Sequence, residues 1–559
     1  MSEPAVDNRM PKGIPYIVTN EFAERFCFYG INSILTVYLA NNLQFTEANA
    51  ASWQSYFKSG AYFFPLIGAI ISDVFWGKFK TILVFSILYA AGCVALAAFK
   101  STPAAIAASL FFVALGTNGI KPCVSTNVGD QFSAKNKHLI EKAFQWFYFA
   151  INAGSSISIY FCPVMLTPVA KRESWKWLPE GPEWAFGIPA AMMMLATIVF
   201  VAGRSRYAHV PPAGKAWLKE IVSKDGVKLV LRLIVIYFFV AMFWMLWDQG
   251  NGNTWTLQAQ SSLMDKNLGF GIKILPAQIQ VVNGLFILAM IPLFQFVIYP
   301  LLGKFFTVTP LRKIGMGLFV IASSFLIVAW IERRIQEGHT VSLWWQILAY
   351  VVLTASEILV SITALEFSYK QAPLKMKSFI MALYLVAVSV GNLGIAAVNE
   401  AMVKPLHATR IETGAETWIT LDEAKEFVTG QKIDVTGESG IVLADATGAG
   451  LKTADGKPKA LAGTFLVAQI DAANSRVRLM DVVERAAVPT TGTFDAVKAK
   501  VATYKLVGPD YFYFFVIVMG IGGIVYIFVA MAYKEQTFVR TEEGHAPSQA
   551  EVDADAEQP

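Results

Sequence analysis

The sequence predicts an all-α membrane protein with twelve transmembrane helices in two six-helix bundles and a small β-rich insert outside the membrane. Two observations carry this prediction. Of the 559 residues, 55% are hydrophobic and 16% are charged, whereas about a quarter of the residues of a soluble domain are charged. Apolar runs of about 20 residues, the length needed to cross a hydrocarbon core of about 30 Å, recur along the chain with short polar breaks between them.

The apolar runs define the expected elements in chain order. The predicted spans are 16–42, 51–75, 79–100, 103–127, 141–163, 184–204, 228–249, 277–302, 311–332, 342–371, 377–402 and 510–533. The longest break on the side of the termini, 205–227, divides the spans six and six, an arrangement typical of transporters whose halves rock about a central site. The expected segments are therefore a tail at 1–15, a bundle at 16–204, a linker at 205–227, helices 7–11 at 228–402, an insert at 403–508, helix 12 at 509–533 and an acidic tail at 534–559.

The distribution of basic residues predicts the orientation. An even number of spans puts both termini on one side, and that side holds about 20 Lys and Arg residues in its short loops and tails against about 8 opposite. We therefore expect cytoplasmic termini and a periplasmic or extracellular insert. The first dozen residues are polar and lack the features of a cleaved secretory signal, so we expect the first helix to be retained.

Composition argues against an enzyme and against nucleic-acid binding. The net charge of +5 is mild. The insert has no cysteine and one histidine, so it offers no recognisable nucleophile or metal constellation, and we expect no cofactor and no metal. The cysteines all lie in apolar runs, where we expect packing residues and no disulfide framework: Cys27, Cys93, Cys123 and Cys162.

The insert at 403–508 is predicted to be a small β-rich domain. Residues 464–472 and 476–483 alternate in polarity as strands do. Thr420 and Glu423 have the spacing of a capping box, which predicts a short helix ending near Gly430.

The first span carries three charged residues on one helical face, Glu21, Glu24 and Arg25. Insertion of a charged side chain at the middle of a membrane span raises the insertion free energy by roughly 2.5–3.5 kcal/mol, so a charged residue there is a candidate for function. The alternative is an ion-paired cluster that fixes helix packing. Two carboxylates and one cation leave an excess acid that can titrate, so we favour a functional site.

Residues 20–30, NEFAERFCFYG, resemble the ExxERFxYY signature of the proton-dependent oligopeptide transporter family, within the major facilitator fold; Phe28 replaces the first tyrosine. Further segments resemble family patterns in both halves: GAIISDVFWGKFKTI at 68–82, GIKPCVS at 119–125, FQWFYFAINAGSS at 144–156, MFWMLWDQ at 242–249 and LEFSYKQAP at 365–373. The resemblance implies a bacterial member similar to mammalian peptide transporters, importing di- and tripeptides together with protons by alternating access.

By the same resemblance, Arg25 and Lys121 would attract the peptide carboxylate and Glu357 would hold the peptide amino group. A cavity with cations on one side and an acid on the other suits a zwitterion. The alternative for Lys121 is a helix-end lysine that reaches the membrane interface.

The resemblance also assigns cavity-lining and gating residues. The lining residues would be Tyr29, Tyr62, Tyr148, Asn152, Trp244 and Asn283. Taken singly, each is as readily explained by interhelical packing. Asp73, Gly77, Lys78 and Lys80 are expected to form a cytoplasmic hinge, and Glu366 a gate or a packing contact.

Carboxylates are the expected proton carriers, because all five histidines lie outside the predicted spans. The candidates are Glu21, Glu24, Asp248 and Glu357, with Glu24 first. We hypothesise that a proton on the first-span carboxylates frees Arg25 to bind the peptide. Ser55 stands where mammalian members have a histidine, and Lys58, one turn later, either reaches outward or adds a second cation near the site.

Two other functions fit the same residues. One is a proton-coupled carrier of another small anion or amphiphile, and the other is a peptide-sensing transceptor whose insert binds a partner. For the favoured function we expect a monomer in the lipid bilayer of a bacterial inner membrane, with peptides and protons as its partners.

Overall fold

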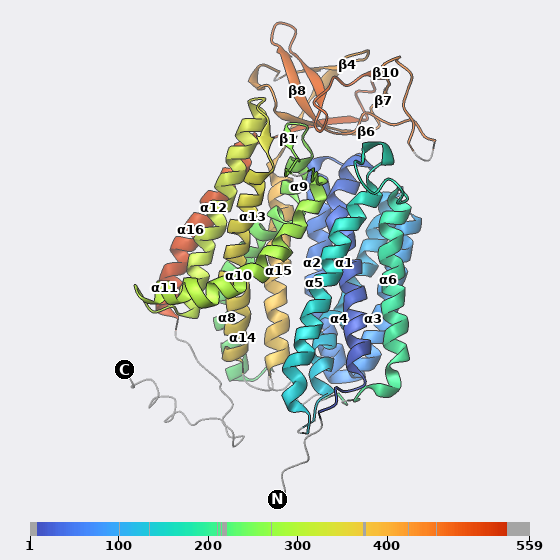
Figure 1. Cartoon of the computed structure of the whole chain (residues 1–559). Coiled ribbons are helices and arrows are strands. Elements are labelled where there is room, and N and C mark those ends of the chain that lie inside the picture. Colours follow the sequence, from blue (N-terminus) through green and yellow to red (C-terminus); the bar gives the residue numbers. More distant parts are fainter. Residues whose placement is uncertain are drawn as a thin grey trace, which may run out of the picture.

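The protein is a bundle of long helices with a β-domain at one end (Figure 1). The computed structural model describes residues 8–533 except 100, 134, 210, 213, 215–220, 270, 373–375, 423 and 454–455. Eleven described helical segments are long and apolar enough to cross a membrane. The chain is thus a multi-pass membrane protein. The predicted tail at 534–559 and parts of the predicted tail 1–15 and linker 205–227 lie outside the described residues.

The N-terminal half is built from helices that run back and forth along the bundle. α1 is the first of them, a helix of 28 residues that is not among the eleven apolar segments because it carries Glu21, Glu24 and Arg25. Thr46 caps α2 by accepting a hydrogen bond from the Asn49 amide. The elements are α1 (Ile14–Asn41), α2 (Glu47–Ile70), the π-helical η1 (Ile71–Trp76), α3 (Lys78–Ala98), α4 (Pro103–Asp130), α5 (Ile140–Leu166) and α6 (Pro182–Ala202).

The C-terminal half repeats this pattern with more irregular helices. A π-helical segment, η7, directly follows Glu357, and such segments often mark functional sites. The elements are α8 (Lys224–Gly250), α9 (Thr254–Gln260), η5 (Pro276–Gln280), α10 (Val281–Leu293), η6 (Phe294–Ile298), α11 (Tyr299–Gly303), α12 (Pro310–Gln336), α13 (Trp344–Glu357), η7 (Ile358–Ile362), α14 (Thr363–Gln371), α15 (Lys377–Met402) and α16 (Pro509–Ala532).

Each half has its own buried hydrophobic core. Leu35, Tyr89 and Phe186 belong to the core of the N-terminal half, and Phe243 and Phe325 belong to that of the C-terminal half. Separate cores allow the halves to move relative to each other as packed units.

All four cysteines are buried and free, which agrees with the predicted packing role. The sulfur atoms of Cys27 and Cys93 lie 3.3 Å apart between α1 and α3.

The insert consists mainly of an antiparallel seven-stranded sheet with the order β3-β11-β6-β8-β9-β5-β4. Buried aliphatic residues such as Ile419, Val435 and Val467 form its core. The strands of this sheet are β3 (Val403–Leu406), β4 (Ala408–Glu412), β5 (Trp418–Leu421), β6 (Lys432–Gly437), β8 (Gly463–Asp471), β9 (Arg476–Asp481) and β11 (Ala499–Tyr504). Two short pairs complete the strands: β7 (Ile441–Leu443) with β10 (Thr490–Gly492), and β1 (Met264–Asp265) with β2 (Val341–Ser342) in the helical part.

The predictions for the insert are partly confirmed. β8 and β9 coincide with the strands expected at 464–472 and 476–483. The capped helix expected from Thr420 is wrong: Thr420 lies in β5, and only a 3₁₀ turn, Ala424–Glu426, follows. Residues 418–421 alternate between half-buried and buried positions, so sheet packing outweighs the local capping pattern. Glu423 lies outside the described residues.

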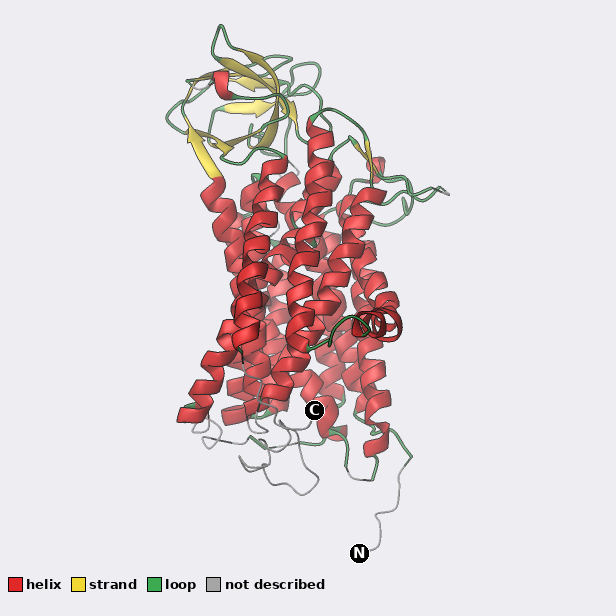
Figure 2. Cartoon of the chain, turned by 90° about the vertical axis from the view of Figure 1, so that its left-hand side faces the viewer, coloured by secondary structure: helices red, strands yellow, loops and turns green. Residues whose placement is uncertain are grey.

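The insert covers one end of the bundle, and we call this the outer side. α1 begins and α16 ends at the opposite, inner side (Figures 1 and 2). This arrangement is the one expected for an even number of crossings.

Candidate functional site

The first site element is a charged cluster on α1. The Nε atom of Arg25 lies 2.7 Å from Oε1 of Glu21 and 3.1 Å from Oε2 of Glu24. Both carboxylates are buried, and Arg25 is largely buried. One guanidinium therefore serves two acids, which leaves one negative charge in excess, as the residue types predict.

Lys121 on α4 points into the N-terminal half. Its ammonium lies 4.1 Å from the ring centroid of Phe28 and 3.8 Å from that of Tyr62, and it donates a hydrogen bond of 3.3 Å to the Ala61 carbonyl. The rings provide cation–π stabilisation. The alternative of a lysine that reaches the membrane interface is therefore wrong, because the charge is held between aromatic rings.

Glu357 is held by two other helices of the C-terminal half. Its Oε2 accepts hydrogen bonds from Nδ2 of Asn283, at 2.9 Å, and from Nε1 of Trp247, at 3.1 Å. Asn283 also donates to the Thr354 hydroxyl at 3.1 Å. α8, α10 and α13 thus converge on one carboxylate, and two neutral donors leave its charge available for a cationic ligand.

Trp247, which donates to Glu357, was not among the residues predicted from the sequence; Trp244 was predicted instead. The two indole rings lie 5.1 Å apart, edge to face, on the same side of α8. Their spacing of three residues was a signal that could have identified Trp247.

Tyr29 lies between the two charged regions in sequence and electrostatic terms. It is one turn beyond Arg25 on α1, and both Arg25 and Glu357 are within electrostatic range of it. Tyr148 on α5 is likewise within electrostatic range of Glu357, and its carbonyl accepts a hydrogen bond of 2.8 Å from Asn152. The structure therefore brings predicted residues from both halves around one region.

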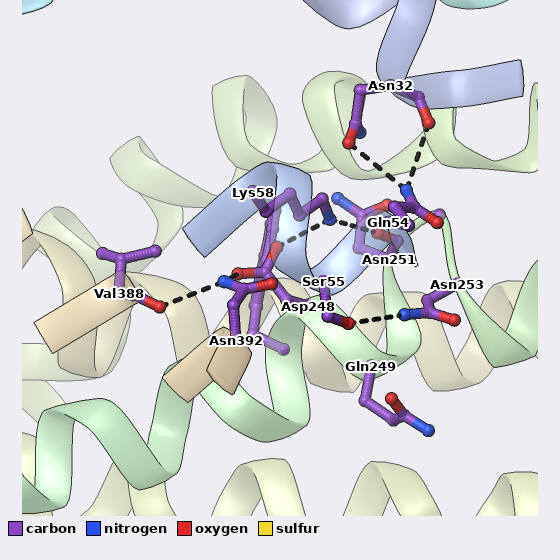
Figure 3. Close-up of polar contacts among 12 residues, drawn as sticks. Asn32, Gln54, Ser55, Lys58, Asp248, Gln249, Asn251, Asn253, Val388 and Asn392 are labelled. Carbon is purple, nitrogen blue, oxygen red and sulfur yellow. Dashed lines mark hydrogen bonds and ion pairs between the residues drawn. The ribbon is translucent and has the colours of Figure 1, made fainter. Parts of the chain in front are cut away.

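Lys58 and Asp248 join the two halves directly (Figure 3). The Lys58 ammonium lies 2.7 Å from Oδ1 of Asp248 and donates a hydrogen bond of 3.2 Å to the Asn251 carbonyl. Nδ2 of Asn392 donates to the other Asp248 oxygen at 2.6 Å and to the Val388 carbonyl at 3.0 Å. The expectation that Lys58 could reach outward is wrong, because it is buried against α8.

Further polar contacts join the two halves near this ion pair. Nδ2 of Asn253 lies 3.3 Å from both the Ser55 hydroxyl and the Ala51 carbonyl (Figure 3). The Thr36 hydroxyl donates to the Gly252 carbonyl at 3.1 Å, and Gln280 donates to the Ser33 carbonyl at 3.1 Å. Ser55, the position noted for its missing histidine, therefore contributes to contact between the halves.

Comparison with known proteins identifies the family. The family model described as "POT family" matches residues 79–223 and 214–419, which include Lys121 and Glu357. The chain belongs to the POT family. The chain is 37% identical over 369 residues to "Peptide transporter family 1" of Drosophila melanogaster, covering 59% of this chain and 48% of that protein. It is 36% identical over 364 residues to "Solute carrier family 15 member 2" of Danio rerio, covering 58% and 50% respectively.

Solved structures of POT family members share the fold of this chain. The crystal structure of the POT family transporter PepTSo matches with a TM-score of 0.63 and 34% identity, over 70% of this chain and 90% of that one. The structure of a proton dependent oligopeptide (POT) family transporter matches with a TM-score of 0.58 and 36% identity, over 69% and 91%. The chain spans about half the length of the curated relatives it matches.

The inner-side residues of this POT family member form a separate group. Gly77, with φ of 73°, separates η1 from α3, and a residue with a Cβ rarely adopts this conformation. Lys78 pairs with Asp130 at the end of α4, and the Asp73 carbonyl accepts a hydrogen bond of 3.2 Å from the Gly214 amide. Lys80 is exposed. These contacts lie where a hinge is predicted.

Glu366 is remote from the charged clusters. It forms an exposed ion pair of 2.7 Å with Lys370 on the same helix. Pairs of this kind contribute little to stability, and the gating role predicted for Glu366 stays a prediction.

Proposed function

We propose that the chain is a proton-coupled symporter that imports di- and tripeptides by alternating access. The observation that carries this proposal is the division of charge between the halves, with Arg25 and Lys121 on one side and Glu357 on the other. A peptide zwitterion has one anionic and one cationic end, and its binding between these groups would draw the halves together. A pure anion gains nothing from Glu357.

Coupling follows from the arrangement around Arg25. While Glu21 and Glu24 are both charged, they hold the guanidinium between them. A proton on one carboxylate removes half of this attraction and frees Arg25 for a peptide carboxylate. Loss of the proton on the other side of the membrane restores the intramolecular pair and expels the peptide. One cation with two mutually exclusive partners supplies the linkage that coupled transport requires.

The Lys58–Asp248 pair is the proposed outer gate. It joins the halves on the outer side, so it stabilises the arrangement in which that side is closed. We therefore assign Asp248, one of the proton-coupling candidates from the sequence, to this gate. Import is the favoured direction, because an inward membrane potential contributes about 2.3 kcal/mol per charge per 100 mV.

For localisation, we propose cytoplasmic termini and an insert outside the cell, supported by the excess of basic residues on the inner side. A monomer suffices, since all proposed ligand contacts come from one chain. The bacterial inner membrane stays a prediction from the sequence; the curated relatives named above are animal proteins.

Uptake by proteoliposomes tests the proposal. Vesicles containing the purified protein, with acid outside and negative potential inside, should accumulate labelled dialanine, and a protonophore should abolish the accumulation. Binding without uptake would instead favour a peptide-sensing transceptor. Uptake of N-acetyl-dialanine as fast as dialanine would favour a carrier of small anions.

A further inference from the structure

The insert is firmly attached to the C-terminal half. β3 continues directly from α15, and β11 leads into α16. These two strands pair with each other, from Val403 opposite Tyr504 to Leu406 opposite Val501, and the Lys505 amide donates to the Met402 carbonyl at 2.8 Å. Because both connections to the helices form one hydrogen-bonded ribbon, the insert moves with the C-terminal half.

The insert also holds the N-terminal half through three contacts near the start of α2. The Lys432 ammonium lies 2.7 Å from Oε2 of Glu47. The Glu47 amide donates to the Thr464 hydroxyl at 2.8 Å, and Nε2 of Gln44 donates to the Ala460 carbonyl at 2.8 Å. The side chains of Glu47 and Lys432 are only 15% and 33% exposed, so this ion pair is partly shielded from water.

The strand that carries Lys432, β6, is held by a polar network inside the sheet. Buried Asp434, two residues along β6, accepts hydrogen bonds from the Thr464 hydroxyl at 2.6 Å and from the Tyr504 hydroxyl at 2.8 Å. These bonds tie β6 to β8 and β11. Glu47 therefore meets a surface that is already ordered, which lowers the entropy lost in forming the contact.

A further contact with the N-terminal half is exposed to solvent: the Lys171 ammonium lies 2.7 Å from Oε1 of Glu484 in the insert. An open crevice of about 650 Å³ lies between the insert and the outer ends of both halves, lined by Phe45 and Leu166 of the N-terminal half, Pro276 of the C-terminal half and Phe465 of the insert. The attachment to the N-terminal half is thus confined to a few polar contacts, which can separate without exposing a large apolar surface.

Glu47 and Lys58 both lie on α2, eleven positions and thus roughly 16 Å apart along the helix axis. Lys58 ties α2 to α8, and Glu47 ties it to the insert that α15 and α16 carry. We propose that the insert is an outer clamp: the Glu47–Lys432 contact holds the outer side closed and must release each time that side opens. This inference rests on the proposed alternating-access transport.

Reversible cross-linking tests whether the clamp must release. In the variant Gln44→Cys/Ala460→Cys, a short bifunctional thiosulfonate reagent should join the insert to the N-terminal half. Dialanine uptake should fall at least tenfold and return on reduction. The four native cysteines are buried, so the unmodified chain serves as the reagent control.

A control cysteine pair joins the insert to the C-terminal half, to which the insert is already attached. The Ser262 amide donates to the Val483 carbonyl at 2.8 Å, so Ser262→Cys/Val483→Cys should cross-link equally well and keep its uptake. Full uptake by the cross-linked Gln44→Cys/Ala460→Cys protein would overturn the clamp. Absence of uptake in the unmodified protein would instead overturn the proposed function.

A distance measurement tests the clamp without transport. Spin labels at Trp177 and Ile272, which are 75% and 55% exposed on outer loops of the two halves, report the separation of the outer side. Lys432→Met and Glu47→Gln should each increase the long-distance population severalfold. Lys498→Met, which removes an insert lysine paired with Glu438, should not. Superposable distance distributions for all variants and the unmodified protein would contradict the proposal.

Discussion

The ammonium of Lys58 on α2 lies 2.7 Å from the carboxylate of Asp248 on α8, and this ion pair joins the two halves of the protein on their outer side. The side chains are 5% and 4% exposed. Removal of one partner from such a buried pair typically destabilises by about 3–5 kcal/mol, because the other charge is left uncompensated. The pair is therefore a strong link between the two halves.

Substitution of either residue should open the outer side. Lys58→Met and Asp248→Asn should each increase the outer separation of spin labels at Trp177 and Ile272. In the double variant the two effects should not add. The coupling free energy, calculated from the open-to-closed population ratios of the four proteins, should be at least about 1.5 kcal/mol. Additive effects would show that the two charges act independently.

Glu24→Gln should abolish proton-driven accumulation and spare exchange. The neutral amide cannot titrate, so Arg25 keeps only Glu21 as its charged partner throughout the cycle. Accumulation of dialanine under a pH gradient should be lost, whereas counterflow between equal proton concentrations should persist. Glu337→Gln, which changes an exposed ion pair with Arg333, should retain both activities. Intact accumulation by Glu24→Gln would reject the coupling scheme.

Glu357→Gln should weaken the binding of peptides with a free amino group. Loss of a charged partner should raise the half-saturating concentration of dialanine by roughly thirtyfold or more, equivalent to about 2 kcal/mol. N-acetyl-dialanine has no ammonium group, so its inhibition constant against dialanine should change less than about threefold. Equal changes for both ligands would assign Glu357 to the structure and not to peptide binding.

Gly154→Ala should destabilise the N-terminal half. A Cβ atom at Gly154 would lie 2.4 Å from the Phe22 carbonyl oxygen, so α5 would have to move away from α1 beside the charged cluster. We expect about 1–3 kcal/mol of destabilisation, measured as a lower midpoint of thermal unfolding in detergent. Gly187→Ala, at a position with open space around it, should leave the midpoint nearly unchanged. A similar loss in both variants would show that the close approach of α5 to α1 is not its cause.

The insert should be more stable at mildly acidic pH. Burial raises the pKa of Asp434 to about 6. The negative charge of Glu47 adds to this shift, whereas the hydroxyls of Thr464 and Tyr504 and the nearby Lys432 partly oppose it. Between the unfolded pKa near 4 and the folded value, the folded insert binds more protons, so its stability falls as pH rises through this window, by on the order of 3 kcal/mol.

Hydrogen exchange measures this effect in the intact protein. After correction for intrinsic rates, amides of β6, β8 and β11 should be better protected at pH 4.5 than at pH 6.5, and Asp434→Asn should remove the difference. Asp471→Asn is the control, because hydrogen bonds from Asn474 and Arg476 lower the pKa of Asp471 below this range. An unchanged pH dependence in Asp434→Asn would assign the effect to another group.

The chemistry of the central site could be predicted one residue at a time. Arg25, Lys121 and Glu357 stand out because each is a charge within an apolar run, a property that needs no knowledge of neighbours. The roles of Tyr148 and Asn152 could not be inferred in this way, because aromatic and amide residues are common in membrane helices for packing alone. Their assignment depended on family resemblance, and the structure adds the hydrogen bond between them.

The sequence by itself determined the membrane class, the positions of the spans and the identity of the buried charges, since run length and polarity are local properties. Only the tertiary structure decided the partners: Lys58 and Asp248 are 190 residues apart, and Glu47 and Lys432 are 385 apart. The same holds for Thr420, where strand pairing replaced the expected helix. Which faces of distant elements meet depends on the packing of the whole chain, so a partner cannot be inferred from a residue's own surroundings in the sequence.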